Sequence, residues 1–262
     1  MGVRGTRVYA VRGRGSGTPY PRLVLLDPET ENDVAYELCQ LLGRSIVPIS
    51  RLDGGPAGAF GTAFFFRQLV AGGEVREYLL TADALTHAPV GEIGLRPSVT
   101  EPAGVAGAAV VLADFPGEWL HRPDLGAAIM PTAGLHEHAD SQGWRWRTQQ
   151  VTDAIAARAD VIARIGAEPG SAFVLALGVG EGGSRPLEVA IKQVAREGDS
   201  VRVTAELPAG YLGAPVFGVQ AGDDEVELRC LGLVLPARDG GHPLATFDRI
   251  HEAVAAGLPG QG

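Results

Sequence analysis

Residues 61–66 read Gly-Thr-Ala-Phe-Phe-Phe, and residues 78–82 read Tyr-Leu-Leu-Thr-Ala. Each stretch is an apolar run of strand length, and a polar, glycine-containing segment separates the two. Comparable runs recur from Ser45 onwards, divided by Gly, Pro and Asp turns; they cover residues 46–49, 108–112, 173–177, 187–194, 201–205, 215–219 and 228–235. Many short strands at this spacing predict an all-β sandwich or a pair of barrels.

The composition is that of an ordinary globular protein with an acidic balance. The chain has 262 residues, of which 45% are hydrophobic and 20% charged, and its formal net charge is -9. A general nucleic-acid binder needs a basic face to neutralise phosphates, so this balance argues against nucleic acid as a partner. Lys192 is the only lysine, and the many glycines and arginines indicate a GC-rich bacterial gene.

Neither a membrane span nor a secretory signal is expected. No stretch reaches the roughly eighteen apolar residues that a spanning helix requires. The first residues carry positive charge, but no apolar run follows them. Cys39 and Cys230 lie far apart in sequence and are expected to be free thiols. We therefore expect a cytoplasmic protein with no membrane partner.

Residues 1–44 are predicted to form a β-α extension ahead of the main domain, which spans residues 45–262. Strand candidates cover residues 7–12 and 23–26. A helix is then expected to begin at Asp27-Pro28, because Asp27 can cap it and Pro28 fits the first turn. Its apolar positions recur at helical spacing before the stop at Gly43; they are Val34, Leu38, Leu41 and Leu42.

Two further helices are expected inside the main domain. The first is capped by Thr152-Asp153 and continues through Ile155, Ala159 and Ile162. The second closes the chain as an amphipathic helix with apolar positions Phe247, Ile250, Val254 and Leu258.

Three segments, in order, resemble the trypsin-like (chymotrypsin-fold) serine peptidase family, and in particular an intracellular bacterial branch. Residues 61–66 and 78–85 resemble the family's G-T-G-F-F-F strand and the strand that ends in T-A-A-H. Residues 123–131 resemble the D-L-A-V-M-P strand that carries its aspartate. Residues 208–217 resemble P-G-S-S-G-S-P-V-F, and residues 231–234 its L-G-I strand. The resemblance covers about residues 46–258 and implies two six-stranded barrels packed face to face.

The resemblance implies that the catalytic serine and histidine have been lost. In the family, a serine hydroxyl attacks a carbonyl while a histidine takes its proton. Leu212 occupies the serine position and Ala84 the histidine position, so neither nucleophile nor base remains. Asp124 matches the aspartate, with no imidazole to orient. Gly210, Tyr211 and Gly213 surround Leu212, and the resemblance implies a vestigial oxyanion turn there.

Asp83, His87 and Tyr211 are expected to lie beside the ligand cleft. A substitute triad of Tyr211, His87 and Asp124 is disfavoured for two reasons. His87 stands three residues beyond the base position, and a phenol with a pKa near 10 is a poor nucleophile.

Three other motifs are interpreted structurally. His136-Glu137-His138 is expected on a polar helix end, where residues two apart point to different faces, and zinc normally needs three or four converging ligands. The glycine-rich residues 178–184 lack the end of a phosphate loop and are read as a hairpin. Trp144 and Trp146 alternate with arginines; the tryptophans are expected to plug the core, with a binding ridge as the alternative.

The resemblance implies a pseudoprotease: a catalytically inactive binding, scaffolding or regulatory module whose inter-barrel cleft holds a protein or peptide partner. The alternative is an enzyme with repurposed, non-proteolytic chemistry in the same cleft, for example in a bacterial biosynthetic pathway. No cofactor and no metal are expected. Oligomeric state and the identity of the partner do not follow from the sequence.

Overall fold

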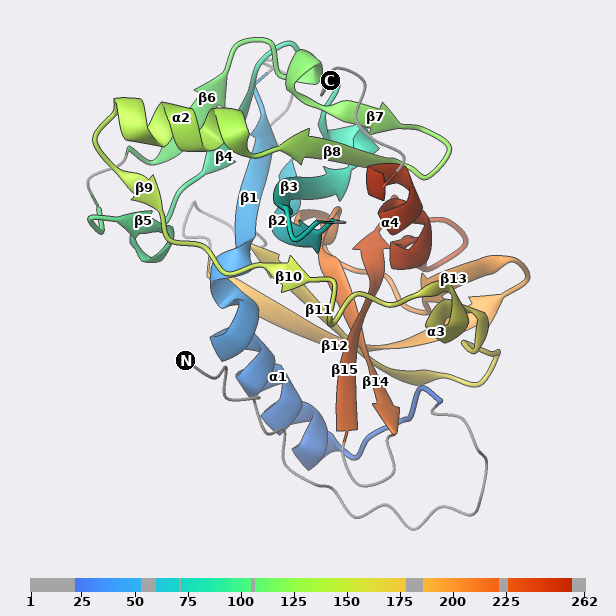
Figure 1. Cartoon of the computed structure of the whole chain (residues 1–262). Helices are drawn as coiled ribbons and strands as arrows, with labels where there is room; N and C mark the ends of the chain where they lie inside the picture. The colour runs from blue at the N-terminus through green and yellow to red at the C-terminus, as the bar shows by residue number, and fades with distance from the viewer. Residues whose placement is uncertain are drawn as a thin grey trace.

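Two β-sheets, one above the other in Figure 1, form most of the protein. The structure is a computed structural model and describes residues 22–52, 60–70, 72–104, 107–177, 186–221 and 226–255. The candidate strand at residues 7–12, the glycine-rich loop at 178–185 and Leu258 lie outside the described residues. In the described part of the chain, no helix is long and apolar enough to cross a membrane.

The first sheet is an open half-barrel. Its strands run in the order β6-β4-β1-β2-β3-β8-β7, with β10 added in parallel to β2. Their bounds are β1 (Ile46–Arg51), β2 (Phe60–Leu69), β3 (Val75–Ala82), β4 (Gly91–Gly94), β6 (Ala109–Leu112), β7 (Leu120–Arg122), β8 (Ala127–Pro131) and β10 (Val151–Thr152). A separate two-stranded sheet pairs β5 (Thr100–Glu101) with β9 (Arg145–Trp146).

The second sheet is a closed six-stranded barrel in the order β11-β12-β13-β16-β15-β14. Closure satisfies every strand edge, which an open sheet leaves exposed. The strands are β11 (Gly170–Leu177), β12 (Leu187–Glu197), β13 (Ser200–Val203), β14 (Pro215–Ala221), β15 (Val226–Val234) and β16 (His242–Thr246). A half-barrel beside a closed barrel, followed by a short C-terminal helix, is a mostly β fold of the trypsin-like double-barrel type.

The expectation of two six-stranded barrels therefore needs one correction. The first sheet has eight strands and stays open, because β6 and β7 form its two ends and do not pair. The segment that leads into β7 contains the 3-10 turn η4 (Pro116–Glu118) and the buried Trp119. No ladder of backbone hydrogen bonds joins these two end strands. Side chains line the seam between them.

The run of three phenylalanines in β2 is core, as expected, and it is buried on both faces. Phe64, Phe65 and Phe66 are fully buried. Successive strand residues point to opposite faces. Accordingly, the Phe66 ring lies 4.9 Å from that of Phe247 on one side, while the Phe65 ring lies 5.4 Å from that of Trp146 on the other. The C-terminal helix and β9 thus cover the two faces of β2.

The prediction that the tryptophans plug the core is confirmed. Trp144 and Trp146 are buried, with ring centroids 5.2 Å apart. The indole nitrogen of Trp146 donates a hydrogen bond to the carbonyl of Leu135 at 3.0 Å. That carbonyl belongs to α2 (Ala133–Ser141), which carries His136, Glu137 and His138 as expected.

The N-terminal helix is confirmed as α1 (Pro28–Leu42). The Asp27 carboxylate accepts hydrogen bonds from the backbone N–H groups of Glu29 and Thr30, both at 3.1 Å. The apolar side of α1 packs against β11 and β12 of the barrel, along which the helix lies in Figure 1. The strand expected at residues 23–26 shrinks to a single bridge between Leu23 and Gln220.

The helix expected from Thr152 to Ile162 is largely wrong. Only α3 (Ala159–Ala163) is helical, and Val151–Thr152 form β10. The intervening residues pair with β15: the N–H of Cys230 donates to the carbonyl of Ile155 at 2.7 Å, and the N–H of Ala157 donates to that of Cys230 at 2.9 Å. Contacts with a strand distant in sequence thus override the local helical pattern. The C-terminal helix is α4 (Phe247–Ala255), as expected.

Candidate functional site

The turn that carries Leu212 is anchored to β2 by a single threonine. It contains the 3-10 turn η5 (Ala209–Tyr211) and continues through Leu212. The buried Thr62 hydroxyl donates to the carbonyl of Gly210 at 2.8 Å, and the Thr62 N–H donates to the carbonyl of Leu212 at 2.8 Å. These bonds hold the end of the closed barrel against the half-barrel.

The turn folds back on itself at Leu212, which the resemblance places at the nucleophile position. The N–H of Leu212 donates to the carbonyl of Ala209 at 3.3 Å, so this amide is already engaged. An oxyanion hole needs backbone N–H groups aimed at an external oxygen. Gly213 follows with φ +81, in the left-handed region that favours glycine, and a Cβ there would lie 2.3 Å from the carbonyl oxygen of Thr62. The glycine is therefore required by the packing of the turn.

Tyr211 points into the closed barrel and is buried. Burial raises the pKa of its phenol to about 12, and the neighbouring Glu188 carboxylate adds to the shift. An anionic phenolate is disfavoured in such surroundings because the charge loses its hydration. Tyr211 does not line the hollow described below.

Ala84 and Asp124 line one hollow, and Leu212 does not. Ala84 belongs to the 3-10 turn η2 (Asp83–Leu85), directly after β3, and is exposed. Leu212 nevertheless lies close to this turn, because a Cβ added to Gly61 would meet the Leu85 side chain and the Leu212 carbonyl, each at 2.5 Å. The structure thus brings the positions that the resemblance assigns to histidine and serine to neighbouring turns on either side of Gly61.

Asp124 lies in the loop between β7 and β8, with its side chain exposed. Its carboxylate accepts two hydrogen bonds from the guanidinium of Arg122, at 3.0 and 2.9 Å, and these lower the pKa of Asp124. Just beyond the end of the β3–β8 ladder, the carbonyl of Gly126 accepts a hydrogen bond from the N–H of Asp83 at 2.9 Å. The carboxylate of Asp124 is thus engaged with the arginine that ends β7.

The hollow between the two sheets has a volume of about 1150 Å³. The half-barrel contributes η2 and the loop before β8, while the barrel contributes the β12–β13 hairpin and the segment that links β15 to β16. α3 and α4 complete its wall. Five acidic and three basic side chains line it: Asp83, Asp124, Glu197, Asp199 and Asp248, with Arg196, Arg238 and Arg249.

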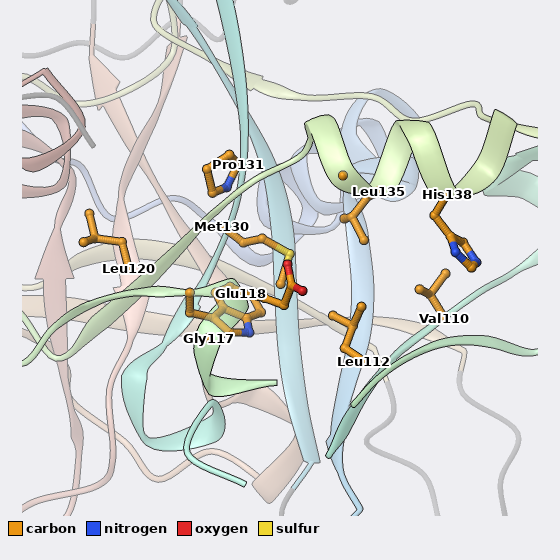
Figure 2. A pocket seen from close by; sticks show the side chains of 11 residues that line it. Val110, Leu112, Gly117, Glu118, Leu120, Met130, Pro131, Leu135 and His138 are labelled. Carbon is orange, nitrogen blue, oxygen red and sulfur yellow. The ribbon is translucent and has the colours of Figure 1, made fainter. Parts of the chain in front are cut away.

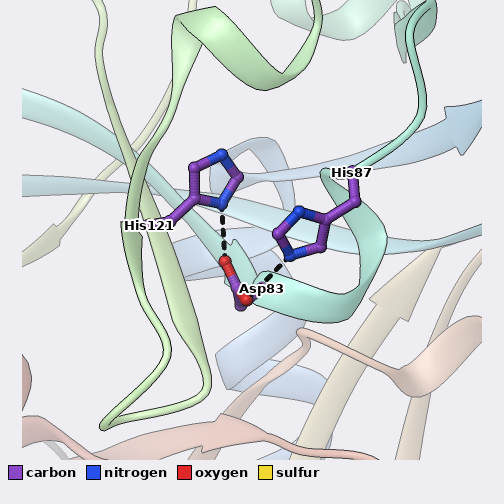
Figure 3. A group of neighbouring side chains, drawn as sticks. All are labelled: Asp83, His87 and His121. Atoms are coloured by element: carbon purple, nitrogen blue, oxygen red, sulfur yellow. Dashed lines mark hydrogen bonds and ion pairs between the residues drawn. The ribbon is translucent and has the colours of Figure 1, made fainter.

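Asp83, which lines this hollow, holds two histidines (Figure 3). His87 Nε2 lies 2.9 Å from Asp83 Oδ2, and His121 Nδ1 lies 2.6 Å from Asp83 Oδ1. The two imidazole rings stack with centroids 4.7 Å apart. Asp83 and His87 were predicted near the cleft, but His121 was not. Only the pairing of β7 with β8 brings it here, and no local sequence signal indicates that pairing.

A second hollow, of about 650 Å³, lies at the open seam of the half-barrel (Figure 2). Apolar side chains from β6, β7, β8 and α2 line most of it: Val110, Leu112, Leu120, Met130 and Leu135. Glu118 of η4 and His138 of α2 are the charged or titratable side chains of its lining. His138 is thus separated from the cluster around Asp83.

Comparisons with known proteins do not assign this chain to a family. No family model matches this chain, and no curated protein matches it in sequence. Among solved structures, a serine endoprotease from Yersinia pestis is similar with a TM-score of 0.49 and 10% identity, over 85% of this chain and 65% of that one. This chain therefore spans less than two thirds of the length of that protein.

A human pathogenic astrovirus serine protease is also similar, with a TM-score of 0.41 and 14% identity, over 76% of this chain and 88% of that one. Both TM-scores lie below 0.5. The assignment of the fold therefore rests on the half-barrel and the closed barrel themselves.

Proposed function

We propose that this chain is a bacterial, cytoplasmic pseudoprotease: a trypsin-like protein without peptidase activity that binds a protein or peptide partner in the hollow between its two sheets. The observation that carries the proposal is the turn at Leu212. A leucine side chain has no nucleophilic atom, and its N–H is bonded to the carbonyl of Ala209. Attack on a carbonyl and stabilisation of the resulting oxyanion are therefore both unsupported at this position.

The other two triad positions support the same proposal. Ala84 offers no base, and the Asp124 carboxylate is exposed and paired with Arg122. The substitute nucleophile Tyr211 is buried with a pKa of about 12, so only a minute fraction is ionised near neutrality.

The hollow supports a binding role. It takes side chains from both sheets, and its volume of about 1150 Å³ can hold several residues of an extended peptide. Acidic side chains outnumber basic ones in its lining, so a partner segment with basic residues is favoured by charge complementarity.

Loss of activity is tested with the purified full chain. We expect neither hydrolysis of casein or small esters nor labelling by a fluorophosphonate probe, because loss of a triad serine or histidine costs on the order of a million-fold in turnover. A trypsin-like peptidase of similar size serves as the positive control. Inhibitor-sensitive labelling of any residue would contradict the proposal.

Binding is tested with an array of extended peptides that vary in net charge, read out by fluorescence anisotropy. Ala84→Trp places a large side chain at an exposed position in the hollow. Ala133→Trp makes the same change at an exposed position on α2, outside this hollow, and is the matched control. We expect basic peptides to bind the unaltered chain and the control, and to bind Ala84→Trp at least about tenfold more weakly, which corresponds to about 1.4 kcal/mol. Equal affinity for both variants would place any bound peptide elsewhere.

A further inference from the structure

The cluster of Asp83, His87 and His121 has the donor set of a metal site. A nitrogen from each histidine and an oxygen from the aspartate all lie within 4.8 Å of one another. Zinc binds imidazole nitrogen at about 2.0–2.1 Å and carboxylate oxygen at about 2.0–2.2 Å, so ligand atoms around one ion lie about 3–3.5 Å apart. The observed nitrogen-to-oxygen distances of 2.6 and 2.9 Å need to open by well under 1 Å to admit an ion.

The hydrogen bonds of His121 direct its Nδ1 towards Asp83, with room for a proton or a metal ion between the two side chains. Its Nε2 lies 3.1 Å from the carbonyl of Pro116, which can only accept, so Nε2 carries the hydrogen. In the neutral imidazole, Nδ1 then presents a lone pair. That lone pair faces Asp83 Oδ1 at 2.6 Å, which is also an acceptor when ionised. Two acceptors at this distance require a proton or a metal ion between them.

Thr86 does not fill the position between His121 and Asp83. Its hydroxyl donates its one hydrogen to the carbonyl of Asp83 at 2.8 Å. At 3.4 Å from His121 Nδ1, the hydroxyl therefore presents a lone pair. The bond to the Pro116 carbonyl fixes the His121 ring and its tautomer, as outer-shell carbonyls commonly do for metal-ligating histidines.

The scaffold places the three side chains without relying on long loops. Asp83 follows β3 directly, and its N–H is bonded to the carbonyl of Gly126 at the start of β8. β8 pairs in turn with β7, which carries His121 opposite Ala128. His87 stands four residues after Asp83, across the single turn η2. Of the three, His121 lies on a paired strand, and strands hold the geometry of a site better than loops do.

We propose that Asp83, His87 and His121 bind a divalent transition-metal ion of the zinc type at the rim of the inter-sheet hollow. The ion lies between His121 Nδ1 and Asp83 and takes a second nitrogen from His87. Three protein ligands leave a coordination position for water or an incoming ligand, the arrangement of open rather than closed zinc sites. His87 is exposed and Asp83 also lines the hollow, so the ion has a route of entry.

The first test is a calorimetric titration of Zn²⁺ into the full, metal-stripped chain. We expect one saturable site per chain. His87→Ala should weaken Zn²⁺ binding by more than about 100-fold. Loss of a residue that only hydrogen-bonds to a metal ligand already lowers metal affinity by about 10–100-fold, and His87 is itself a ligand in this proposal. His87 is exposed, so this variant should keep the fold, which circular dichroism checks. Absence of saturable binding to the unaltered chain would overturn the proposal.

His136→Ala is the matched control, because His136 Nε2 also pairs with a carboxylate, that of Glu77 at 3.3 Å. We expect it to bind Zn²⁺ as the unaltered chain does. Asp83→Asn removes the anionic ligand with little change of shape and should behave like His87→Ala. With Co²⁺ as the probe, the unaltered chain and the control should develop visible ligand-field absorption, while His87→Ala and Asp83→Asn should not. Equal loss in His136→Ala, or binding that is unchanged in His87→Ala, would refute the site.

Discussion

The turn at Leu212 should depend on the hydroxyl of Thr62 for its stability. This hydroxyl is fully buried, donates to the carbonyl of Gly210 at 2.8 Å and accepts from the N–H of Leu177 at 3.2 Å. Thr62→Val keeps the shape of the side chain and removes both hydrogen bonds. Each buried group left without a partner costs about 1–3 kcal/mol. Because two such groups lose their partner, we expect the free energy of unfolding to fall by about 2 kcal/mol or more.

The assay is equilibrium unfolding in urea, with thermal melting as a second measurement. For a chain of this size, a loss of about 2 kcal/mol corresponds to a fall of about 4–8 °C in the melting temperature. Thr204→Val is the matched control, since Thr204 is exposed and its hydroxyl donates to the carbonyl of Gln193 at 3.3 Å. That change should alter stability by no more than about 0.5 kcal/mol. If the two variants unfold within about 0.5 kcal/mol of each other, Thr62 does not anchor the turn and the reasoning fails.

Three further predictions follow from the same region. Gly213→Ala should lower the free energy of unfolding in urea more than Gly240→Ala does. Both glycines have positive φ (+81 and +75), but of the two only Gly213 has atoms that an added Cβ would meet. Equal losses would show that backbone strain alone sets the cost of the substitution. The double change Ala84→His with Leu212→Ser should not restore ester hydrolysis in a folded protein. The reason is that the N–H of residue 212 is bonded to the carbonyl of Ala209, and the Asp124 carboxylate is bonded to Arg122. Robust turnover would show that the cleft is still that of a peptidase. Ultraviolet titration should detect one tyrosine that ionises near pH 12, and this titration should be absent from Tyr211→Phe. The pKa of Tyr211 in the folded protein is raised above the unfolded value of about 10. Its contribution to the free energy of unfolding is therefore full below pH 10 and is lost as the pH rises towards 12.

Much of the fold could be predicted because its signals are local. The cap at Asp27 needs only the N–H groups of the next few residues, so the start of α1 was predicted correctly. The three phenylalanines of β2 and the alternating tryptophans were also interpreted correctly. Large apolar side chains have few alternatives to the core in a chain of this size. The number and spacing of the apolar runs predicted a sandwich or a pair of barrels, and the resemblance favoured the barrels, of which one is closed.

The failures share a physical cause, which is competition from residues distant in sequence. Residues 155–157 have a helical pattern, but Cys230 offers their backbone groups strand-like hydrogen bonds. The half-barrel stays open because its end strands do not reach each other, a property of the whole sheet and of neither strand alone.

The sequence by itself determined that Leu212 and Ala84 stand where the resemblance expects a serine and a histidine, because the identity of a side chain at a motif position is independent of the fold. Only the tertiary structure decided that the N–H of Leu212 is bonded to Ala209 and that His121 joins Asp83 and His87. His121 reaches Asp83 through the register of β7 on β8 and the hydrogen bond from Asp83 to Gly126. Such a register is selected by the burial of entire strands, and no short stretch of sequence encodes it.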